Sequence, residues 1–68
     1  MAVFSGAVTR IDRKAQTGTI RGDDRRTHPF SREAMVFWLH FLDLKPGTRV
    51  RYEVEAHSND AFNIELAQ

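Results

Sequence analysis

The chain has no cysteine and only two prolines among its 68 residues. Without cysteine, neither a disulfide bond nor a thiolate zinc site can stabilise so short a chain. Long apolar runs are absent too: the longest, Ala34 to Leu39, falls far short of the roughly 20 residues that a membrane-spanning helix needs. Residues 1–5 lack the basic start of a secretory signal. We therefore expect a single soluble, cytoplasmic domain over residues 1–68, without a membrane partner.

The composition is that of a folded globular domain, with 41% hydrophobic and 28% charged residues. A chain of this length buries only about 60% of its unfolded surface, so a buried multi-residue active site would compete with the core. The net charge of +1 conceals an asymmetry: residues 1–32 carry seven lysines and arginines against three acids, and residues 33–68 carry three against six. The basic half either attracts phosphate or forms a surface of mixed charges, and the sequence leaves both interpretations open.

Alternation of apolar and polar residues predicts β-strands, because successive side chains of a strand point to opposite faces. The pattern is clearest over residues 49–55, and it recurs at Phe62, Ile64 and Leu66. The polar turn 57–60 joins these two runs, which predicts an antiparallel hairpin.

Three further strands are expected upstream, over residues 3–11, 16–22 and 27–30. In the first strand, Gly6 indicates a bend or the close approach of another backbone. In the third, Pro29 indicates a sheet edge or a bulge. The second strand should present three polar side chains on one face, namely Thr17, Thr19 and Arg21.

Residues 31–42 follow a different pattern and are expected to form a helix. Ser31 can cap its first turn and Glu33 favours that turn, while Pro46 and Gly47 lie beyond its end. Apolar side chains cover more than half of the circumference of this expected helix, so we expect them to contact a second surface besides the sheet. These side chains are Ala34, Met35, Phe37, Trp38, Leu39, Phe41 and Leu42.

Three strands, a connecting helix and two more strands predict a mainly all-β fold. The expected architecture is a small, closed, five-stranded barrel of the OB type, with a short helix between strands 3 and 4. No repeat, linker or low-complexity segment divides the chain.

Five segments of the chain resemble the cold-shock domain family. They are GAVTRID (6–12), TGTI (17–20), PFS (29–31), LKPGTRVRYEVE (44–55) and AFNIELA (61–67), where the family reads GTVKWFN, FGFI, HFS, LxxGxxVxFEV and AxNV. The match spans nearly the whole chain and depends on the spacing of glycines and core apolar residues. It implies an OB-fold barrel of cold-shock type that binds single-stranded RNA or DNA on one sheet face.

The chain departs from the family at the aromatic side chains on which bases stack. The family motifs resembling KGFGFI and VFVHF carry three phenylalanines that are threonines here, at Thr17, Thr19 and Thr27. The family's tryptophan falls on Arg10 and its histidine on Pro29, which leaves Phe30 as the preserved aromatic. Each stacked base contributes about 1–3 kcal/mol, and a micromolar complex totals about 8 kcal/mol, so losing four rings removes much of the affinity.

The interactions that remain for nucleic acid are electrostatic and hydrogen-bonding. Phosphate attraction needs no aromatic ring, and arginine planes also stack on bases. The resemblance therefore implies weak, salt-dependent and largely non-specific binding. The residues expected to carry it are Arg10, Lys14, Thr17, Thr19, Arg21, Arg25, Arg26, His28 and Phe30.

The alternative is a protein-interaction or self-associating module in which nucleic-acid binding is lost. In the family, the segment between strands 3 and 4 is a loop of glycines and charges, whereas residues 34–42 are rich in bulky apolar side chains. Aromatic residues and methionine are enriched at interface centres. The candidates for a homodimer or other protein contact are Met35, Phe37, Trp38 and Phe41. The same side chains could instead plug the end of the barrel, and some could do both.

No pattern indicates catalysis or a metal cofactor. The three histidines lack the spacing of metal ligands. Asp23 and Asp24 lie beside two arginines and fit a surface turn better than a pair of acid/base carboxylates. Ser31 has no histidine or acid at a spacing that suggests a catalytic triad. We expect no enzymatic activity and no cofactor.

Overall fold

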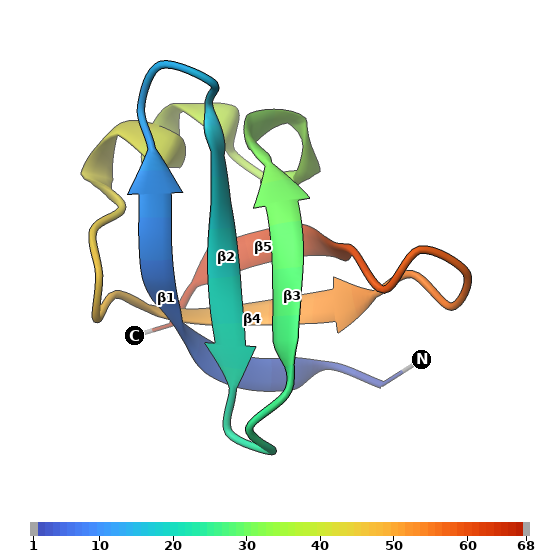
Figure 1. Cartoon of the computed structure of the whole chain (residues 1–68). Helices are drawn as coiled ribbons and strands as arrows, with labels where there is room; N and C mark the ends of the chain where they lie inside the picture. Colours follow the sequence, from blue (N-terminus) through green and yellow to red (C-terminus); the bar gives the residue numbers. More distant parts are fainter. Residues whose placement is uncertain (1, 68) are drawn as a thin grey trace.

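The computed structural model describes residues 2–67 and shows a mainly β chain. Its strands are β1 (Phe4–Asp12), β2 (Thr17–Gly22), β3 (Thr27–Ser31), β4 (Arg49–Val54) and β5 (Ala61–Leu66). Neighbouring strands pair antiparallel, in the order β3-β2-β1-β4-β5. The sheet curls into a half-barrel in which β1, β2 and β3 stand side by side and β4 and β5 cross behind them (Figure 1). The predicted antiparallel, five-stranded, mainly β architecture is confirmed.

The half-barrel stays open between its two edge strands, β3 and β5. Within residues 2–67 no ladder of hydrogen bonds joins these strands, so the full closure expected from the sequence is not seen. One bridge spans this side instead: Met35 pairs with Ile64, and the N–H of Val36 donates to the carbonyl oxygen of Ile64 at 2.9 Å. Pro29 lies on the edge strand β3, as predicted for a residue that has no N–H to donate.

All five strands and the segment between β3 and β4 contribute side chains to one core. Gly6 lies at a close approach of two backbones, because a Cβ there would overlap the carbonyl oxygen of Arg21. The close approach predicted at Gly6 is therefore confirmed. The largest fully buried side chains are those of Val8, Ile20, Phe41, Leu44, Val50, Tyr52 and Ile64.

The segment between β3 and β4 contains short helices, but not the single helix expected over residues 31–42. It forms two 3-10 helices, η1 (Arg32–Ala34) and η2 (Trp38–Asp43), with an extended stretch between them. The side chain of Ser31 makes no capping hydrogen bond. The bridge of Met35 to β5 holds the backbone extended where an α-helix would have to continue, and the aromatic residues that follow have only modest helix propensity.

Arg13, in the turn between β1 and β2, holds the end of η2 against the sheet. Its Nη1 donates to the carbonyl oxygens of Phe41 at 3.3 Å and Leu42 at 3.4 Å, and its Nη2 donates to the carbonyl oxygen of Leu44. Carbonyl groups at the end of a helix have no further turn to pair with. One arginine thereby joins the connecting segment to the first hairpin.

A β-bulge in β1 changes the face that the following residues occupy. Val8 pairs with Ile20, both in the core, but the next pair in the ladder is Arg10 with Thr19. Thr9 is therefore an extra residue. Strict alternation from Val8 would point Arg10 inward, but the extra residue turns its side chain outward.

A second bulge interrupts β5. The register between β4 and β5 shifts between Arg51 and Glu53, and β5 carries the extra residue. Asn63 at this point has a φ of 49°, in the left-handed region that asparagine tolerates better than most residues. Ile64 consequently lies in the core while Phe62 is half-buried outside it. Alternation predicts that Phe62 and Ile64 share one face of the strand, and this prediction is wrong.

Candidate nucleic-acid interface

The outward side chains of β1, β2 and β3 form three rows across the sheet, named here the outer face. Each row holds one residue of β1, its partner on β2 and that residue's partner on β3. The first row is Asp12, Thr17 and Ser31, the second is Arg10, Thr19 and Pro29, and the third is Ala7, Arg21 and Thr27. Thr17, Thr19 and Arg21 share this face, as alternation predicts. None of the side chains in the three rows is aromatic. The outer face therefore offers hydroxyl, guanidinium and carboxylate groups to a ligand, but no aromatic ring.

Two residues predicted to contact nucleic acid, His28 and Phe30, lie in the core, and each is only 4% exposed. The His28 ring lies 5.6 Å from that of Tyr52, and its Nδ1 is 3.0 Å from the carbonyl oxygen of Asn59. The Phe30 ring packs edge-on against Phe41, with ring centroids 6.4 Å apart. Both residues alternate with the outward positions of β3, so neither belongs to the outer face.

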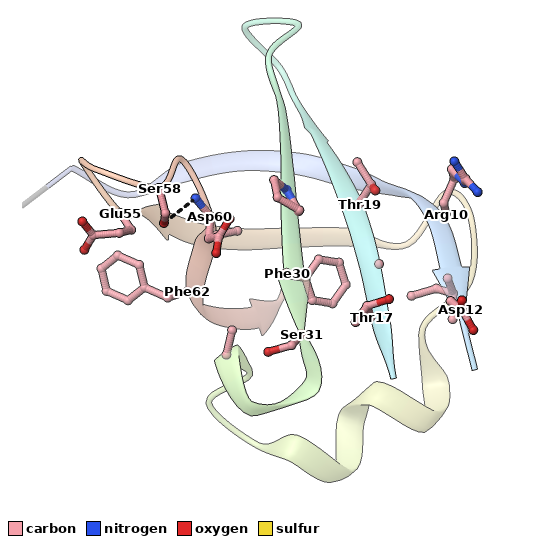
Figure 2. A pocket seen from close by; sticks show the side chains of 15 residues that line it. Arg10, Asp12, Thr17, Thr19, Phe30, Ser31, Glu55, Ser58, Asp60 and Phe62 are labelled. Carbon is pink, nitrogen blue, oxygen red and sulfur yellow. Dashed lines mark hydrogen bonds between the residues drawn. The ribbon is translucent and has the colours of Figure 1, made fainter. Parts of the chain in front are cut away.

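A hollow of about 730 Å³ extends from the outer face, across β3, to the hairpin between β4 and β5. Arg10 and Thr19 line one end, and Asp60 and Phe62 line the other (Figure 2). β3 runs between the two ends in this view. The hollow thus combines residues from strands that are far apart in the sequence.

The residues at the hairpin end of the hollow, Phe62, Asp60 and Glu55, are absent from the sequence-based site. Phe62 alternates with Ile64 and is therefore assigned to the core unless the bulge is known. The carboxylate of Glu55 is engaged, because its Oε1 accepts a hydrogen bond from the N–H of His57 at 2.9 Å. The carboxylate of Asp60 accepts no hydrogen bond and no ion pair from residues 2–67.

The cationic residues predicted to bind nucleic acid are exposed, but they are spread along the sheet rather than gathered in one patch. Arg10 and Arg21 lie in different rows of the outer face. Lys14 lies in the β1–β2 turn, and Arg25 and Arg26 lie in the β2–β3 turn at the other end of the sheet (Figure 1). Within residues 2–67 none of these five side chains forms an ion pair, so their charges are available to phosphate. We call them the five cations.

Two other arginines are already engaged. Arg49 forms a bidentate ion pair with Asp23, with N–O distances of 3.0 and 2.8 Å, and Arg51 meets Glu65 at 3.4 Å. The hydrogen bonds from Arg49 lower the pKa of Asp23, and the carboxylate raises the pKa of Arg49 in return. Burial raises the pKa of the Tyr52 hydroxyl.

The apolar segment expected to contact another protein divides into a buried and an exposed part. Met35 and Phe41 are 6% and 1% exposed, so for these two residues the plug interpretation holds. Phe37 and Trp38 are 63% and 57% exposed. The guanidinium of Arg32 covers the indole of Trp38 at 4.3 Å from the ring centroid. The exposed part, named here the apolar patch, consists of Val36, Phe37, Trp38, Leu39 and Leu42.

Among known proteins, no family model and no curated sequence matches the chain. In the described part of the chain, no helix has the length and apolar character needed to cross a bilayer. Across residues 2–67, no group of three or more His, Cys, Asp or Glu side chains is placed to hold a metal ion. The outer face, the hollow and the apolar patch are therefore the features from which a function can be inferred.

Proposed function

We propose that the chain binds single-stranded RNA or DNA through its outer face, weakly and mainly by electrostatic contact with phosphates. The observation that carries the proposal is that the five cations are exposed and unpaired among residues 2–67, whereas Arg49 and Arg51 are engaged in ion pairs. A guanidinium presents a rigid fork of N–H donors that suits a phosphate group. The hydroxyls of Thr17 and Thr19 add hydrogen-bonding capacity between the cations.

We also propose that the half-barrel is an open OB-type barrel of the cold-shock kind. The strand order β3-β2-β1-β4-β5 supports the resemblance seen in the sequence, because a three-stranded meander is continued by a second hairpin. That resemblance implies a binding surface on the outer sides of β1, β2 and β3. Here Thr17 and Thr19 stand where the family has rings, so charge has to provide most of the affinity.

Binding of this kind depends strongly on salt. Each phosphate of a single strand that is neutralised contributes a slope of about −0.7 to log K against log salt concentration. Four such contacts therefore imply a loss of affinity of about 50-fold between 50 and 200 mM salt. The five cations are distributed from the β1–β2 turn to the β2–β3 turn, so a bound strand would have to follow the outer face to reach most of them.

Fluorescence anisotropy with a labelled single-stranded hexanucleotide, at low and at moderate salt, tests the proposal. Arg21→Gln should weaken binding and make the salt slope shallower by about 0.7, because one phosphate contact is lost. Lys45→Gln removes the same charge from the loop before β4 and serves as the matched control. The proposal is wrong if no binding is seen at low salt, or if both variants weaken binding equally.

The apolar patch favours a second candidate function, self-association with a second copy of the chain. A typical monomer exposes a largest apolar patch of about 300–600 Å², and such a patch is often functional. The members of the patch are all apolar, and a charge lies against one of them, because the guanidinium of Arg32 covers the indole of Trp38. A two-fold dimer places the same patch of both copies face to face, so the apolar side chains of one copy meet those of the other.

Sedimentation equilibrium over a range of concentrations tests self-association. The native protein should gain mass with concentration, and a Phe37→Ser, Trp38→Ser variant should remain a monomer. Phe41 is left unchanged because it is buried and its removal would open the core. Ala56→Ser changes an exposed apolar side chain in the turn between β4 and β5, outside the patch, and is the control. A native protein that is monomeric at every concentration excludes this function.

A further inference from the structure

We propose that the hairpin end of the hollow holds one unpaired nucleobase that carries an exocyclic amino group, as cytosine does. The base stacks on Phe62 and donates a hydrogen bond to the carboxylate of Asp60. The proposal rests on the proposed binding of single strands and deepens it. It adds one base-selective position to a surface that otherwise recognises only phosphate.

The two bulges direct side chains into this hollow. The extra residue in β1 turns Arg10 outward, and the extra residue in β5 does the same for Phe62. Both side chains line the hollow, at its opposite ends (Figure 2). Bulges are over-represented next to active sites, where they re-aim a side chain. Both bulges thus direct a side chain into the same concave surface.

Phe62 supplies the ring that the outer face lacks. Two phenylalanines line the hollow, but Phe30 belongs to the core and packs against Phe41. Phe62 lies outside the core and is half-buried, so one part of its ring is held by the protein and the rest is open to a ligand. A partly fixed aromatic ring stacks on a base at little cost in side-chain entropy, and stacking itself tolerates any base.

Asp60 makes the position selective. Its backbone is fixed on both sides. Its N–H donates to Oγ of Ser58 at 3.2 Å (Figure 2), and its carbonyl oxygen accepts from the N–H of Glu55 at 2.8 Å. Its carboxylate is exposed and accepts no bond from residues 2–67, and an ionised carboxylate can accept hydrogen bonds but not donate them. Cytosine presents an amino donor at C4, where uracil and thymine present an acceptor oxygen. The N3–H of uracil or thymine lies between two acceptor oxygens that a carboxylate would also approach, so the carboxylate favours cytosine over these two bases.

The charges of the hollow also orient the strand. Glu55 and Asp60 repel phosphate from the hairpin end, whereas Arg10 attracts it at the other end. Asp12 lies near Arg10, but its Oδ1 already accepts from the N–H groups of Lys14 and Ala15 at 3.1 and 3.0 Å. A bound strand consequently places a base against Phe62 and runs its backbone toward Arg10.

Two measurements test the proposal. In the first, cytidine and uridine, which carry no phosphate, are titrated while the ring resonances of Phe62 are followed by NMR. Cytidine should shift them at lower concentration than uridine does. In the second, oligo(C) and oligo(U) hexamers are compared by anisotropy. Oligo(C) should bind about fivefold more tightly, the smallest discrimination expected of a good hydrogen-bonded base contact.

Substitutions at the two residues separate stacking from selection. Asp60→Ala should reduce the affinity for oligo(C) to that for oligo(U). Asp43→Ala removes an exposed acid from η2 and should leave the preference for oligo(C) unchanged. Phe62→Leu keeps the bulk of the side chain but removes the ring, and it should weaken both hexamers by about tenfold or more. Phe37→Leu is the control for an exposed ring outside the hollow.

The outcomes distinguish this inference from the function on which it rests. Equal binding of oligo(C) and oligo(U), with equal responses to the two nucleosides, overturns the base-selective position and leaves phosphate binding intact. Binding of neither hexamer, together with no response to cytidine, overturns both. A cytidine shift at Phe62 without hexamer binding supports the base position and shows that the five cations do not bind phosphate.

Discussion

Arg10 lies directly opposite Thr19 in the β1–β2 ladder, although alternation from the buried Val8 would turn it inward. The extra residue Thr9 produces this shift of face. Arg10 is exposed as a result, and its guanidinium forms no ion pair among residues 2–67. Arg10 therefore presents its charge on the outer face, beside the hydroxyl of Thr19.

An aromatic ring added to the outer face should raise the affinity for single strands. Thr19 points outward beside Arg10, so Thr19→Phe adds a stacking surface without disturbing the core. We expect binding of a single-stranded hexanucleotide to tighten by about tenfold or more, because a stacked base contributes about 1–3 kcal/mol. Anisotropy titration measures the change. Ser5→Phe places the same ring at an exposed position outside the three rows, and an equal gain there would show that the outer face is not the binding surface.

The ion pair between Asp23 and Arg49 should make stability depend on pH in the acid range. Hydrogen bonding from Arg49 holds the folded-state pKa of Asp23 below its ordinary value of 3.8. The stability that the pair contributes is therefore fully present above that value and is lost as pH falls through the folded pKa. Both side chains are more than a third exposed, so the contribution is small and is screened by salt.

Urea denaturation of the native protein and of Asp23→Asn, repeated from neutral to acid pH, measures this dependence. The difference in unfolding free energy between the two proteins should be largest at neutral pH and should vanish in acid. Asp43→Asn removes an exposed carboxylate that forms no ion pair in the described chain, and it should show no such trend. A difference that persists unchanged in acid would show that Asp23 acts by something other than its charge.

The strands could be predicted from the sequence because each buries one face. From Arg49 to Val54, charged and apolar residues alternate, and the apolar Val50 and Tyr52 are buried in the structure. Gly6 predicts the close approach of another backbone, because glycine has no side chain in the way. Pro29 predicts a sheet edge, because proline has no N–H to donate inside a ladder of hydrogen bonds. These signals are local, which is why they can be read from the chain alone.

The bulges and the connecting segment could not be predicted in the same way, because both depend on distant partners. Nothing in the neighbourhood of Asn63 requires a left-handed backbone; the pairing of β5 with β4 decides it and moves Phe62 outward. Met35 likewise stays extended because it bridges to Ile64. The hairpin end of the hollow depends on these two long-range contacts. The sequence therefore predicts the outer face of the candidate site but not its hairpin end.

The hydrogen bonds from Arg13 to η2 should stabilise the fold measurably. A charged donor that satisfies carbonyl groups at a helix end contributes about 1.5–3 kcal/mol, so Arg13→Ala should lower the unfolding free energy by about that amount. Urea denaturation checks the prediction, and Arg10→Ala is the matched control, because Arg10 is exposed and forms no ion pair within residues 2–67. Its removal should cost less than about 0.5 kcal/mol.

Arg13→Lys sharpens this last test. A lysine keeps the charge but lacks the planar fork that lets one side chain reach the carbonyl oxygens of Phe41, Leu42 and Leu44 together. If the fork matters, Arg13→Lys should recover only part of the stability that Arg13→Ala loses. Full recovery by lysine would assign the effect to charge near the end of η2, and equal stability of Arg13→Ala and Arg10→Ala would show that the connecting segment is held by its core contacts alone.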